Sequence, residues 1–432
     1  MPKKEMGRFN DAAVRQSRNM QVAHLLRKYN PSEWGGTETA VKRLCDGLRA
    51  HQVQSVAFCP QLETTPDDDP LAEAGHSVKR FRACVPVWGI TPENRRALVS
   101  MGGNLMSFGL IWDLWREPGV SVVHAHTQNR LGGIGLTVSR LRNIPLVVSI
   151  HGGVLDLPAA ARDHLAAPLQ GGFEWGKVLG APLRSRRVLE EANAIITCNK
   201  KEAQLLEQKY PRQNVLVQPH GVSAEDYEKD RRPAAFAAFP SLIGKKVLLM
   251  AGRIDTVKNQ NWVVKEAPRL IKKFPDLMFA MAGSVTDQPY AKAIAQDIQR
   301  LGLGENILLT GGLPPGDARL LGLFQVAKAL VLPSLSEPFG LVILESWASG
   351  TPVISSRTSG AVELIDEGKT GWLFDLDQPE GFHVAVGQAL ANPEGAARMG
   401  EAGRKIVKAD YDTVVLAGRV KRLYEQLIQE MS

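Results

Sequence analysis

The chain has 432 residues, of which 44% are hydrophobic and 22% charged, a composition typical of folded globular proteins. Two domains are expected, because a single hydrophobic core rarely serves so long a chain. No uninterrupted apolar run reaches about 18 residues, so a membrane-spanning helix is not predicted. We therefore expect a soluble two-domain protein rather than a largely disordered one.

The net charge of +7 favours an anionic partner such as a nucleotide, a nucleic acid or an acidic membrane surface. Nucleic acid is not expected, because Lys and Arg are spread along the chain and no helix-turn-helix or zinc-finger pattern is present. A weak peripheral contact with the inner face of the membrane is a second hypothesis, since residues 100–116 combine Trp112 and Trp115 with apolar residues. The other interpretation of this segment is an amphipathic helix packed on the core.

The cysteines and the N-terminus bear on location. The four cysteines lie far apart without a CxxC pair, so neither a disulfide framework nor a zinc site is predicted, and a reducing cytoplasm fits best. Residues 1–20 include basic side chains but no apolar core of signal-peptide length. We interpret them as an N-terminal extension that could be disordered.

Short apolar runs alternate with amphipathic segments in chain order, which is the pattern of a parallel α/β sheet. In the first half these segments are "QVAHLL" (21–26), the helix-like "TETAVKRLCDGLRAH" (37–51), "SVAFCP" (55–60), "VSVVHAHT" (120–127), "IPLVVSIHGG" (144–153), "NAIITCNK" (193–200) and "VLVQPHGV" (215–222). In the second half they are "VLLMAGRI" (247–254), "LMFAMAGS" (277–284), "NILLTGG" (306–312), "ALVLPSL" (329–335), "TPVISS" (351–356) and "GWLFD" (371–375). The pattern predicts two doubly wound Rossmann-like domains of the α/β class.

A polar, Pro-containing segment between the two halves marks the predicted domain boundary. The expected organisation is an N-terminal domain at 21–224, a linker at 225–243, a C-terminal domain at 244–410 and a final helix at 411–432. In open parallel sheets, ligands bind at the carboxyl ends of the strands, where loops lead into helix N-termini that attract anions. The unusual residues of the sequence follow expected strands: Gly35, Gly36, His151, Arg253, Lys258 and Glu337. This clustering favours one composite site between two facing sheets.

Two loops could hold a phosphate. The loop "AGRIDTVKNQNW" carries Arg253 and Lys258 five residues apart, so both cations can converge on one anionic group such as a diphosphate. In "NPSEWGGTETAVKRL", the missing Cβ atoms of Gly35 and Gly36 would let backbone N–H groups approach a phosphate. Two solvated surface cations and an ordinary helix-starting loop are the alternatives.

The stretch "LPSLSEPFGLVILESWASGTPVISS" places Glu337 and Glu345 around a Pro-Phe-Gly turn in an apolar region. Burying an unpaired charge is costly, so a partner or ligand is expected for each carboxylate. Carboxylates accept hydrogen bonds from hydroxyl groups, so a sugar ring for Glu337 and a ribose for Glu345 are chemically sensible. A nucleophile and acid pair of the glycosidase type, and two surface glutamates flanking a helix, are the alternatives.

Three histidines are also candidates. His151 in "SIHGGV" follows an expected strand and could donate a hydrogen bond to a substrate oxygen, shuttle a proton or be structural. His124 and His126 could ligate a metal on spacing alone, but without an acidic partner nearby a structural role is favoured. The Asp-x-Asp sequences in "PDDDP" and "DLD" are interpreted as solvated turns. No metal site is predicted.

These motifs together resemble those of the retaining nucleotide-sugar glycosyltransferases of family 4, which have the GT-B fold, over nearly the whole chain. The shared features are the Arg-x4-Lys loop, the Glu-x7-Glu motif with its Pro-Phe-Gly turn, "ASGTPVISS" and "EGKTGWLF", in the family's order and spacing. The resemblance implies two Rossmann-like domains facing a cleft. It also implies that the first domain binds the acceptor, the second binds the donor, and the final helix crosses back to the first.

The resemblance implies residue roles by motif position. The catalytic residues would be His151, Arg253, Lys258 and Glu337, and the donor-binding residues would be Gly36, Leu313, Phe339, Gly340, Leu341 and Glu345. Arg253, Lys258 and the Gly36 N–H would hold the diphosphate, Leu313 would lie beside the base, and Glu345 would bind the ribose. Glu337 and the backbone after it would hold the sugar, which His151 would contact from the other domain.

Two departures from the family pattern qualify this interpretation. Pro314 and Pro315 stand where some guanine-using relatives carry an acid, which favours a uridine nucleotide. Residues 164–187 match no family motif and are expected to shape acceptor choice. The expected function is retaining transfer of a hexose from a nucleotide sugar, with UDP favoured, to a glycan, lipid-linked or small-molecule acceptor, without cofactor or metal. A nucleotide-sugar epimerase or a phosphorylase of the same fold, and a non-catalytic nucleotide-sugar-binding protein, are the alternatives.

Overall fold

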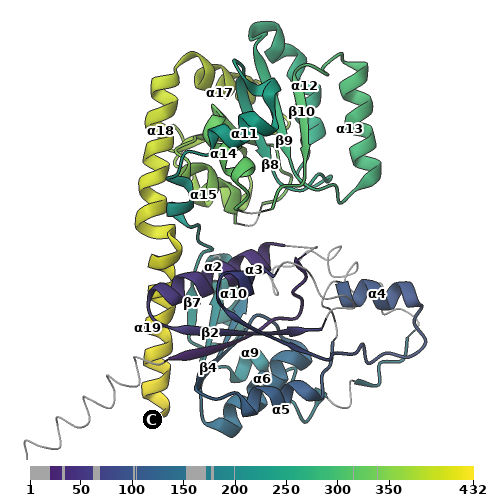
Figure 1. Ribbon diagram of the computed structural model, residues 1–432, viewed down its shortest axis with the longest axis vertical. Helices are drawn as coiled ribbons and strands as arrows, with labels where there is room; N and C mark the ends of the chain where they lie inside the picture. Colours follow the sequence, from purple (N-terminus) through teal and green to yellow (C-terminus); the bar gives the residue numbers. More distant parts are fainter. Residues whose placement is uncertain are drawn as a thin grey trace, which may run out of the picture. The chain divides into compact units, whose positions relative to one another are not determined.

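The computed structural model describes residues 20–31, 35–61, 69–100, 103, 105–151, 172–176, 180–198, 200–314, 316–337 and 339–432. The predicted N-terminal extension therefore lies outside the described residues, apart from Met20. The chain divides into two compact units, Met1–Pro219 with Val414–Ser432, and His220–Thr413 (Figure 1).

Within the described residues, the first unit is built on a parallel sheet of seven strands in the order β3-β2-β1-β4-β5-β6-β7. The strands are β1 (Gln21–Leu25), β2 (Gln54–Pro60), β3 (Ser77–Phe81), β4 (Val120–Ala125), β5 (Leu146–Ile150), β6 (Ala194–Thr197) and β7 (Val215–Val217). The central strands β1, β4 and β5 are buried almost throughout, so they are apolar on both faces.

Helices cover both faces of this sheet (Figure 1). They are α2 (Gly36–Ala50), α3 (Pro70–Glu73), α4 (Pro92–Ser100), α5 (Gly109–Arg116), α6 (Asn129–Arg142), α9 (Val188–Glu191), α10 (Lys200–Lys209) and α19 (Thr413–Met431). The last of these, α19, supplies Val420, Tyr424 and Leu427 to a buried cluster with Val22 and Val122 of the sheet. The end of the chain is therefore part of the first unit's core.

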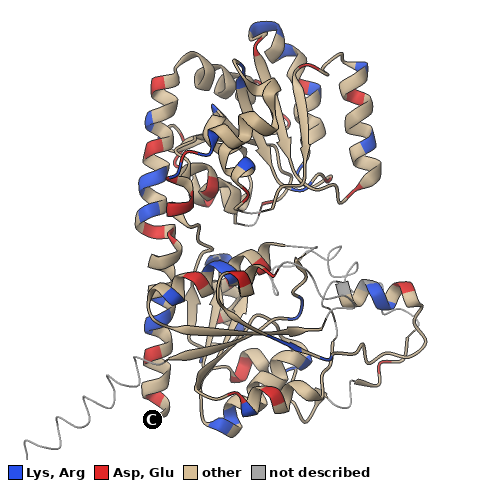
Figure 2. Ribbon diagram, viewed as in Figure 1, with Lys and Arg blue, Asp and Glu red and all other residues tan. Residues whose placement is uncertain are grey.

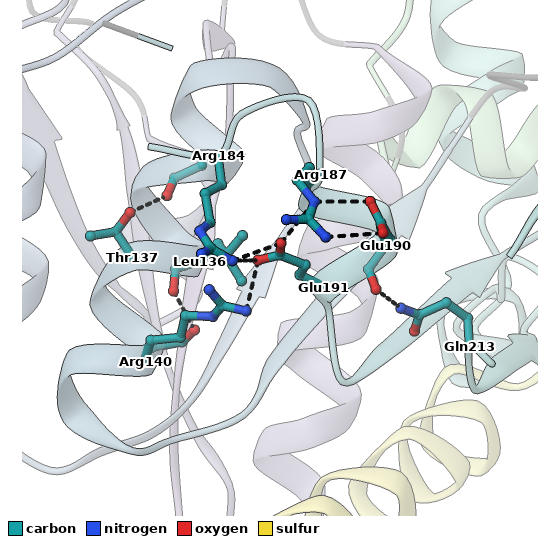
Figure 3. Close-up of polar contacts among 10 residues, drawn as sticks. Leu136, Thr137, Arg140, Arg184, Arg187, Glu190, Glu191 and Gln213 are labelled. Atoms are coloured by element: carbon teal, nitrogen blue, oxygen red, sulfur yellow. Dashed lines mark hydrogen bonds and ion pairs between the residues drawn. The ribbon is translucent and has the colours of Figure 1, made fainter. Parts of the chain in front are cut away.

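An ion-pair cluster, here the Glu191 cluster, joins α9 to α6 (Figure 3). The Glu191 side chain is only 8% exposed and pairs with Arg140 at 2.7 Å, Arg184 at 2.9 Å and Arg187 at 3.0 Å. Arg187 also pairs with Glu190 at 3.1 Å. Four of these five residues lie within eight positions of one another, so the cluster fixes the local chain path into α9.

Within the described residues, the second unit holds a parallel sheet of six strands in the order β10-β9-β8-β11-β12-β13. The strands are β8 (Lys246–Ala251), β9 (Leu277–Ala282), β10 (Ile307–Gly311), β11 (Ala329–Leu332), β12 (Val353–Ser356) and β13 (Gly371–Phe374). The helices are α11 (Arg232–Ala238), α12 (Gln260–Lys273), α13 (Gln288–Arg300), α14 (Ala318–Val326), α15 (Leu341–Ala348), α16 (Ser359–Leu364), α17 (Pro379–Ala391) and α18 (Pro393–Ile406). Two buried clusters, one on each face, complete this core.

The segment 225–243, expected to be a linker, is instead structured as part of the second unit. It contains α11, and its residues Ala235 and Leu242 are 0% and 1% exposed. A Cβ at Gly322 of α14 would lie 2.3 Å from the Arg231 carbonyl oxygen, so α14 packs closely on this segment. The polar residues that suggested a linker flank an apolar run that the core takes up.

The prediction of two doubly wound α/β domains is confirmed. Lys and Arg are interspersed with Asp and Glu along the helices of both units, as is typical of solvated surfaces (Figure 2). Among the described helices, none combines the length and the apolar character needed to cross a membrane. Trp112 and Trp115 of α5 are 49% and 46% exposed, whereas Leu110 and Leu114 of the same helix are fully buried, so α5 is an amphipathic helix packed on the core.

Candidate active site

The loop from β8 to α12 carries the predicted cations at the carboxyl edge, meaning the edge where the parallel strands end. The buried carboxylate of Asp255 shapes this loop by accepting the Lys258 N–H at 2.9 Å, and Gln260 donates to the Arg253 carbonyl oxygen at 2.7 Å. A Cβ at Gly283 would lie 1.8 Å from the Gly252 carbonyl oxygen, so only glycine allows the loops after β8 and β9 to meet.

Lys258 and Glu337 are brought into direct contact although 79 positions separate them. Their side chains form an ion pair and are 21% and 14% exposed. Arg253 is directed differently: it is 63% exposed and pairs with Asp255 at 3.3 Å. The edge therefore holds one half-buried ion pair, Lys258–Glu337, and a neighbouring cation, Arg253, whose long side chain is exposed to solvent.

Hydrogen bonds and close backbone contacts restrict the conformation of the turn from Glu337 into α15. Gly340 has a φ of 90°, which favours glycine, and its N–H donates to Glu337 Oε1 at 3.2 Å. The Glu337 carbonyl oxygen accepts the Gly360 N–H at 2.8 Å, and a Cβ at Gly360 would lie 2.6 Å from the Phe339 carbonyl carbon. The first turn of α15 is thereby fixed beside the Lys258–Glu337 pair. Pro338 lies outside the described residues.

Glu345 lies in α15, and Leu313 follows β10. Residues four positions apart share a helix face, so Glu345 lies on the same side of α15 as Leu341, at its N-terminus. Both Glu345 and Leu313 are half-buried. A Cβ at Gly312 would lie 2.1 Å from Ser284 Oγ, so the loop before Leu313 packs tightly on the loop after β9.

The loops after four neighbouring strands converge at this edge. Main-chain hydrogen bonds join Ile254 N–H to the Ser284 oxygen at 2.9 Å and Leu335 N–H to the Val257 oxygen at 2.8 Å. The order β10-β9-β8-β11 makes them adjacent. All of the predicted second-domain site residues therefore lie in α15 or in loops at one edge of one sheet.

In the first unit, Gly36 begins α2 and Gly35 is its N-cap. A Cβ built on Gly36 would meet no atom of the described residues within 4 Å, and Gly36 is exposed, so no described packing contact requires a glycine here.

His151 directly follows β5 and belongs to a chain of ring contacts. Its Nε2 lies 2.8 Å from His126 Nδ1, and His126 Nε2 lies 3.0 Å from His24 Nδ1. His24 and His126 are buried, and burial lowers the pKa of His24 to about 3. His24 was missed in the sequence analysis, although a polar residue in the otherwise apolar run "QVAHLL" was a signal.

His124 has separate partners. Its Nδ1 lies 2.6 Å from the Tyr424 hydroxyl of α19, and its Nε2 lies 2.7 Å from Ser149 Oγ. Burial holds the pKa of His124 well below its usual range. Within the described residues, nitrogens of His24, His124 and His126 lie within 4.8 Å of one another and could in principle hold a metal ion. Because His124 uses both nitrogens for hydroxyl groups, the rings form hydrogen bonds pair by pair rather than facing a common centre.

Part of the unusual segment 164–187 lies at this edge as well. Phe173 and Trp88 exchange main-chain hydrogen bonds of 2.8 and 2.9 Å, and their side chains are 66% and 64% exposed. The buried Arg130, at the start of α6, donates to the Gly176 carbonyl oxygen at 2.9 Å. Two large exposed aromatic side chains therefore lie on segments that main-chain hydrogen bonds hold together.

The chain resembles solved structures over 94% of its length. HepE of Anabaena, in a crystal structure described as a complex with UDP, has a TM-score of 0.67 and 17% sequence identity, covering 94% of this chain and 100% of that one. This likeness, with the two parallel sheets, defines the class: the protein has the GT-B fold.

Family models match both units. Residues 35–221 match the "Glycosyl transferase 4-like domain" and residues 232–406 match "Glycosyl transferases group 1". Glycogen synthase of Mycobacterium tuberculosis (strain CDC 1551 / Oshkosh) is 26% identical over 423 residues, 94% of each chain. D-inositol 3-phosphate glycosyltransferase of Corynebacterium urealyticum is 27% identical over 401 residues, 88% of this chain and 90% of that protein. The chain is thus a glycosyltransferase of the family 4 kind, as its motifs predicted.

Proposed function

We propose that this glycosyltransferase is a retaining enzyme that moves a sugar from a nucleotide-sugar donor to a glycan, lipid-linked or small-molecule acceptor. The observation that carries the proposal is the half-buried Lys258–Glu337 ion pair beside the first turn of α15. A cation, a carboxylate and a helix N-terminus at one sheet edge match the three parts of a sugar diphosphate: its charge, its hydroxyl groups and its phosphate oxygens.

In this proposal Lys258 and Arg253 neutralise the diphosphate. Lys258 is held in place by Glu337, whereas the exposed Arg253 can turn from Asp255 towards a phosphate. These groups supply the positive charge that a metal ion provides in other transferases, so no metal is required.

The remaining donor contacts follow from the same edge. Glu337 accepts hydrogen bonds from sugar hydroxyls, together with the backbone of Phe339, Gly340 and Leu341. Glu345, on the face of α15 shared with its N-terminus, binds the ribose hydroxyls. Leu313 lies beside the base, and the position of Pro314 after it supports uridine over guanine, as does the UDP named with HepE.

Retention follows from front-face attack. The acceptor oxygen bonds to the anomeric carbon on the face from which the diphosphate departs, and the acceptor proton passes to a departing phosphate oxygen. Lys258 and Arg253 stabilise the charge that develops there. Neither carboxylate is then needed as a nucleophile, which separates this mechanism from that of the glycosidases.

The acceptor would bind to the first unit. The exposed rings of Trp88 and Phe173 support this assignment, since exposed aromatic surfaces are typical of binding sites. Segment 164–187 would then set acceptor choice, as expected from its lack of family motifs.

Thermal unfolding with a panel of nucleotide sugars tests the donor. A bound donor at about 100 times its dissociation constant adds roughly 2.7 kcal/mol of stability. The stabilising donor is then incubated with candidate acceptors, and the anomeric configuration of the product is read by NMR. An inverted product contradicts retention. Isomerisation of the donor without an acceptor indicates an epimerase, phosphate-dependent cleavage a phosphorylase, and binding without turnover a non-catalytic protein.

A further inference from the structure

Two short segments of the first unit, residues 84–90 and 172–176, lie side by side and are here called the aromatic ribbon. Trp88 and Phe173 exchange both main-chain hydrogen bonds, at 2.9 and 2.8 Å, as antiparallel strands do. A Cβ at Gly172 would lie only 3.2 Å from the Trp88 carbonyl oxygen, so a glycine suits this close approach. The backbone therefore brings together residues that the sequence places 85 positions apart.

The two faces of the aromatic ribbon differ. Val87 is 1% exposed, and Glu174 forms an ion pair with the buried Arg130 of α6. Trp88 and Phe173 are instead 64% and 66% exposed. Neighbouring side chains of extended backbone point to opposite faces, which explains this alternation. One face of the ribbon is therefore packed on the first unit, and the other presents aromatic rings to solvent.

Three rings extend along the exposed face. The Trp88 ring centroid lies 6.1 Å from that of Phe173 and 6.1 Å from that of the half-buried Trp175, with interplanar angles of 26° and 38°. Such spacings are typical of offset ring pairs, in which each ring leaves part of its face uncovered. The exposed face is therefore a strip of neighbouring rings, longer than a single ring.

Charge on the aromatic ribbon is confined to its packed side. Glu174 is the one charged residue among its described members, and it faces Arg130. Arg95 of α4 donates to the carbonyl oxygens of Val85 and Val87 at 3.1 and 3.0 Å. An anionic bilayer or a nucleic acid would be met by Lys or Arg side chains among the rings. The uncharged strip is better matched to a neutral ligand.

We propose that the aromatic ribbon binds a neutral saccharide, a disaccharide or longer, through the C–H faces of its pyranose rings. A pyranose with equatorial hydroxyl groups carries axial C–H bonds on its faces, and these partly positive hydrogens are attracted to the negative face of an aromatic ring. A strip of several rings can contact successive sugar units. The inference rests on the proposed function only in assigning this saccharide as the acceptor, since the ribbon lies wholly in the first unit.

Saccharide binding is measured without any nucleotide sugar. Isothermal titration calorimetry of the full-length protein compares glucose and mannose with maltotetraose, cellotetraose and mannotetraose. We expect at least one tetrasaccharide to bind about 10-fold more tightly than its monosaccharide. Saturation-transfer difference NMR should then give the strongest signals at C–H protons on one face of its rings. Absence of binding by all three tetrasaccharides, or equal affinity for the monosaccharide, would overturn the proposal.

Variants that keep or remove a flat ring test the contact. Trp88→Leu retains an apolar side chain but loses the ring, and it should weaken tetrasaccharide binding about 10-fold. Phe173→Leu should act in the same direction, whereas Phe173→Tyr should bind as the wild type does. Trp112→Leu is the control, because Trp112 is a 49% exposed tryptophan of α5 outside the ribbon. Thermal unfolding verifies that each variant folds, and Phe173→Leu decides if Trp88→Leu does not.

Other occupants give different results. Unchanged tetrasaccharide binding in both leucine variants would overturn the proposal. So would binding of the wild type to phosphatidylglycerol vesicles, or its dimerisation, if Trp88→Leu abolished either and left saccharide binding intact. Failure of this inference is separable from failure of the proposed function. Sugar transfer with an unchanged acceptor KM in Trp88→Leu contradicts only the inference, whereas saccharide binding by a protein that no nucleotide sugar stabilises contradicts only the proposed function.

Discussion

The carboxyl edges of the two sheets are built by the same topology but carry opposite kinds of chemistry. The edge of the first unit presents histidines joined ring to ring, and burial lowers the pKa of His24 and of the neighbouring His124. The edge of the second unit presents ions, with Lys258 on Glu337 and Arg253 on Asp255. Parallel α/β topology determines that side chains able to bind a ligand gather at the carboxyl edge of the sheet. It does not determine whether those side chains are histidines or ions, which depends on a few residues in the loops.

The ion pairs of the two units also differ in how they are assembled. The Glu191 cluster of the first unit surrounds one carboxylate with three guanidinium groups, most of them close in sequence. The Lys258–Glu337 pair is drawn from two loops far apart in sequence, next to a helix N-terminus and a second carboxylate. Under the proposed function, the second arrangement is the one that meets a ligand carrying both charge and hydroxyl groups.

The largest effect is expected from Lys258→Ala. Negative charge grows on the leaving diphosphate during reaction, so removal of this cation should lower kcat by about 10² to 10³, as for other preorganised charge-stabilising groups. Steady-state kinetics at saturating donor measures this loss. Lys369→Ala is the control, since Lys369 pairs with Asp366 and its side chain is 76% exposed. A normal kcat in Lys258→Ala would contradict the proposed role.

Glu345→Gln should act on donor binding instead. Ribose hydroxyls change little during the reaction, so weaker hydrogen bonds should raise the donor KM by the equivalent of roughly 1 to 3 kcal/mol, with kcat nearly unchanged. The control is Glu380→Gln, which alters an exposed pair with Arg269. If kcat falls while donor affinity stays the same, Glu345 does not bind the ribose.

Glu191→Gln tests the Glu191 cluster, for which we expect a structural role. It should lower the free energy of unfolding by about 1 kcal/mol, because the amide keeps one accepting oxygen for the arginines, turns an N–H donor towards the others and loses the charge pairing. Chemical denaturation measures this change, and kcat and KM should not move. Glu190→Gln, with a side chain 51% exposed, should cost less. A kinetic effect of Glu191→Gln would assign the cluster to the active site.

The smallest effect is expected from chelation. Lys258, Arg253 and the first turn of α15 supply enough positive charge for a diphosphate, so turnover should be the same with and without EDTA. Initial rates in metal-stripped buffer measure this. Loss of activity that magnesium or manganese restores would show that the charged edge needs an ion as well.

The sequence predicted the fold, and it predicted that candidate residues of the second unit would gather at one edge of the sheet. Residues that follow buried strands must gather at one edge, and this placed Arg253, Lys258 and Glu337 without any alignment. It did not predict that Lys258 would pair with Glu337 and Arg253 with Asp255, since loop geometry rather than spacing decides which charges meet.

The ring contacts among His24, His126 and His151 could not be predicted in the same way. His24 and His126 are 102 positions apart, and their contact depends on the register in which β1 pairs with β4. One residue of slippage would turn His24 to the opposite face of the sheet. The expectation of a linker at 225–243 differs from the structure for another reason. Charged residues flank the apolar run that forms α11 and packs on α14, so the segment read as polar overall.

The position of α19 has a consequence for synthesis of the protein. The first unit takes its sheet from residues before 219 and its last helix from residues after 413, whereas the second unit is continuous. On the ribosome, all of the second unit emerges while β1 and β4 still lack the helix that covers Val22 and Val122. A ribosome that stalls before Tyr424 therefore leaves a chain with one finished unit and one exposed apolar face, a substrate for chaperones and proteases.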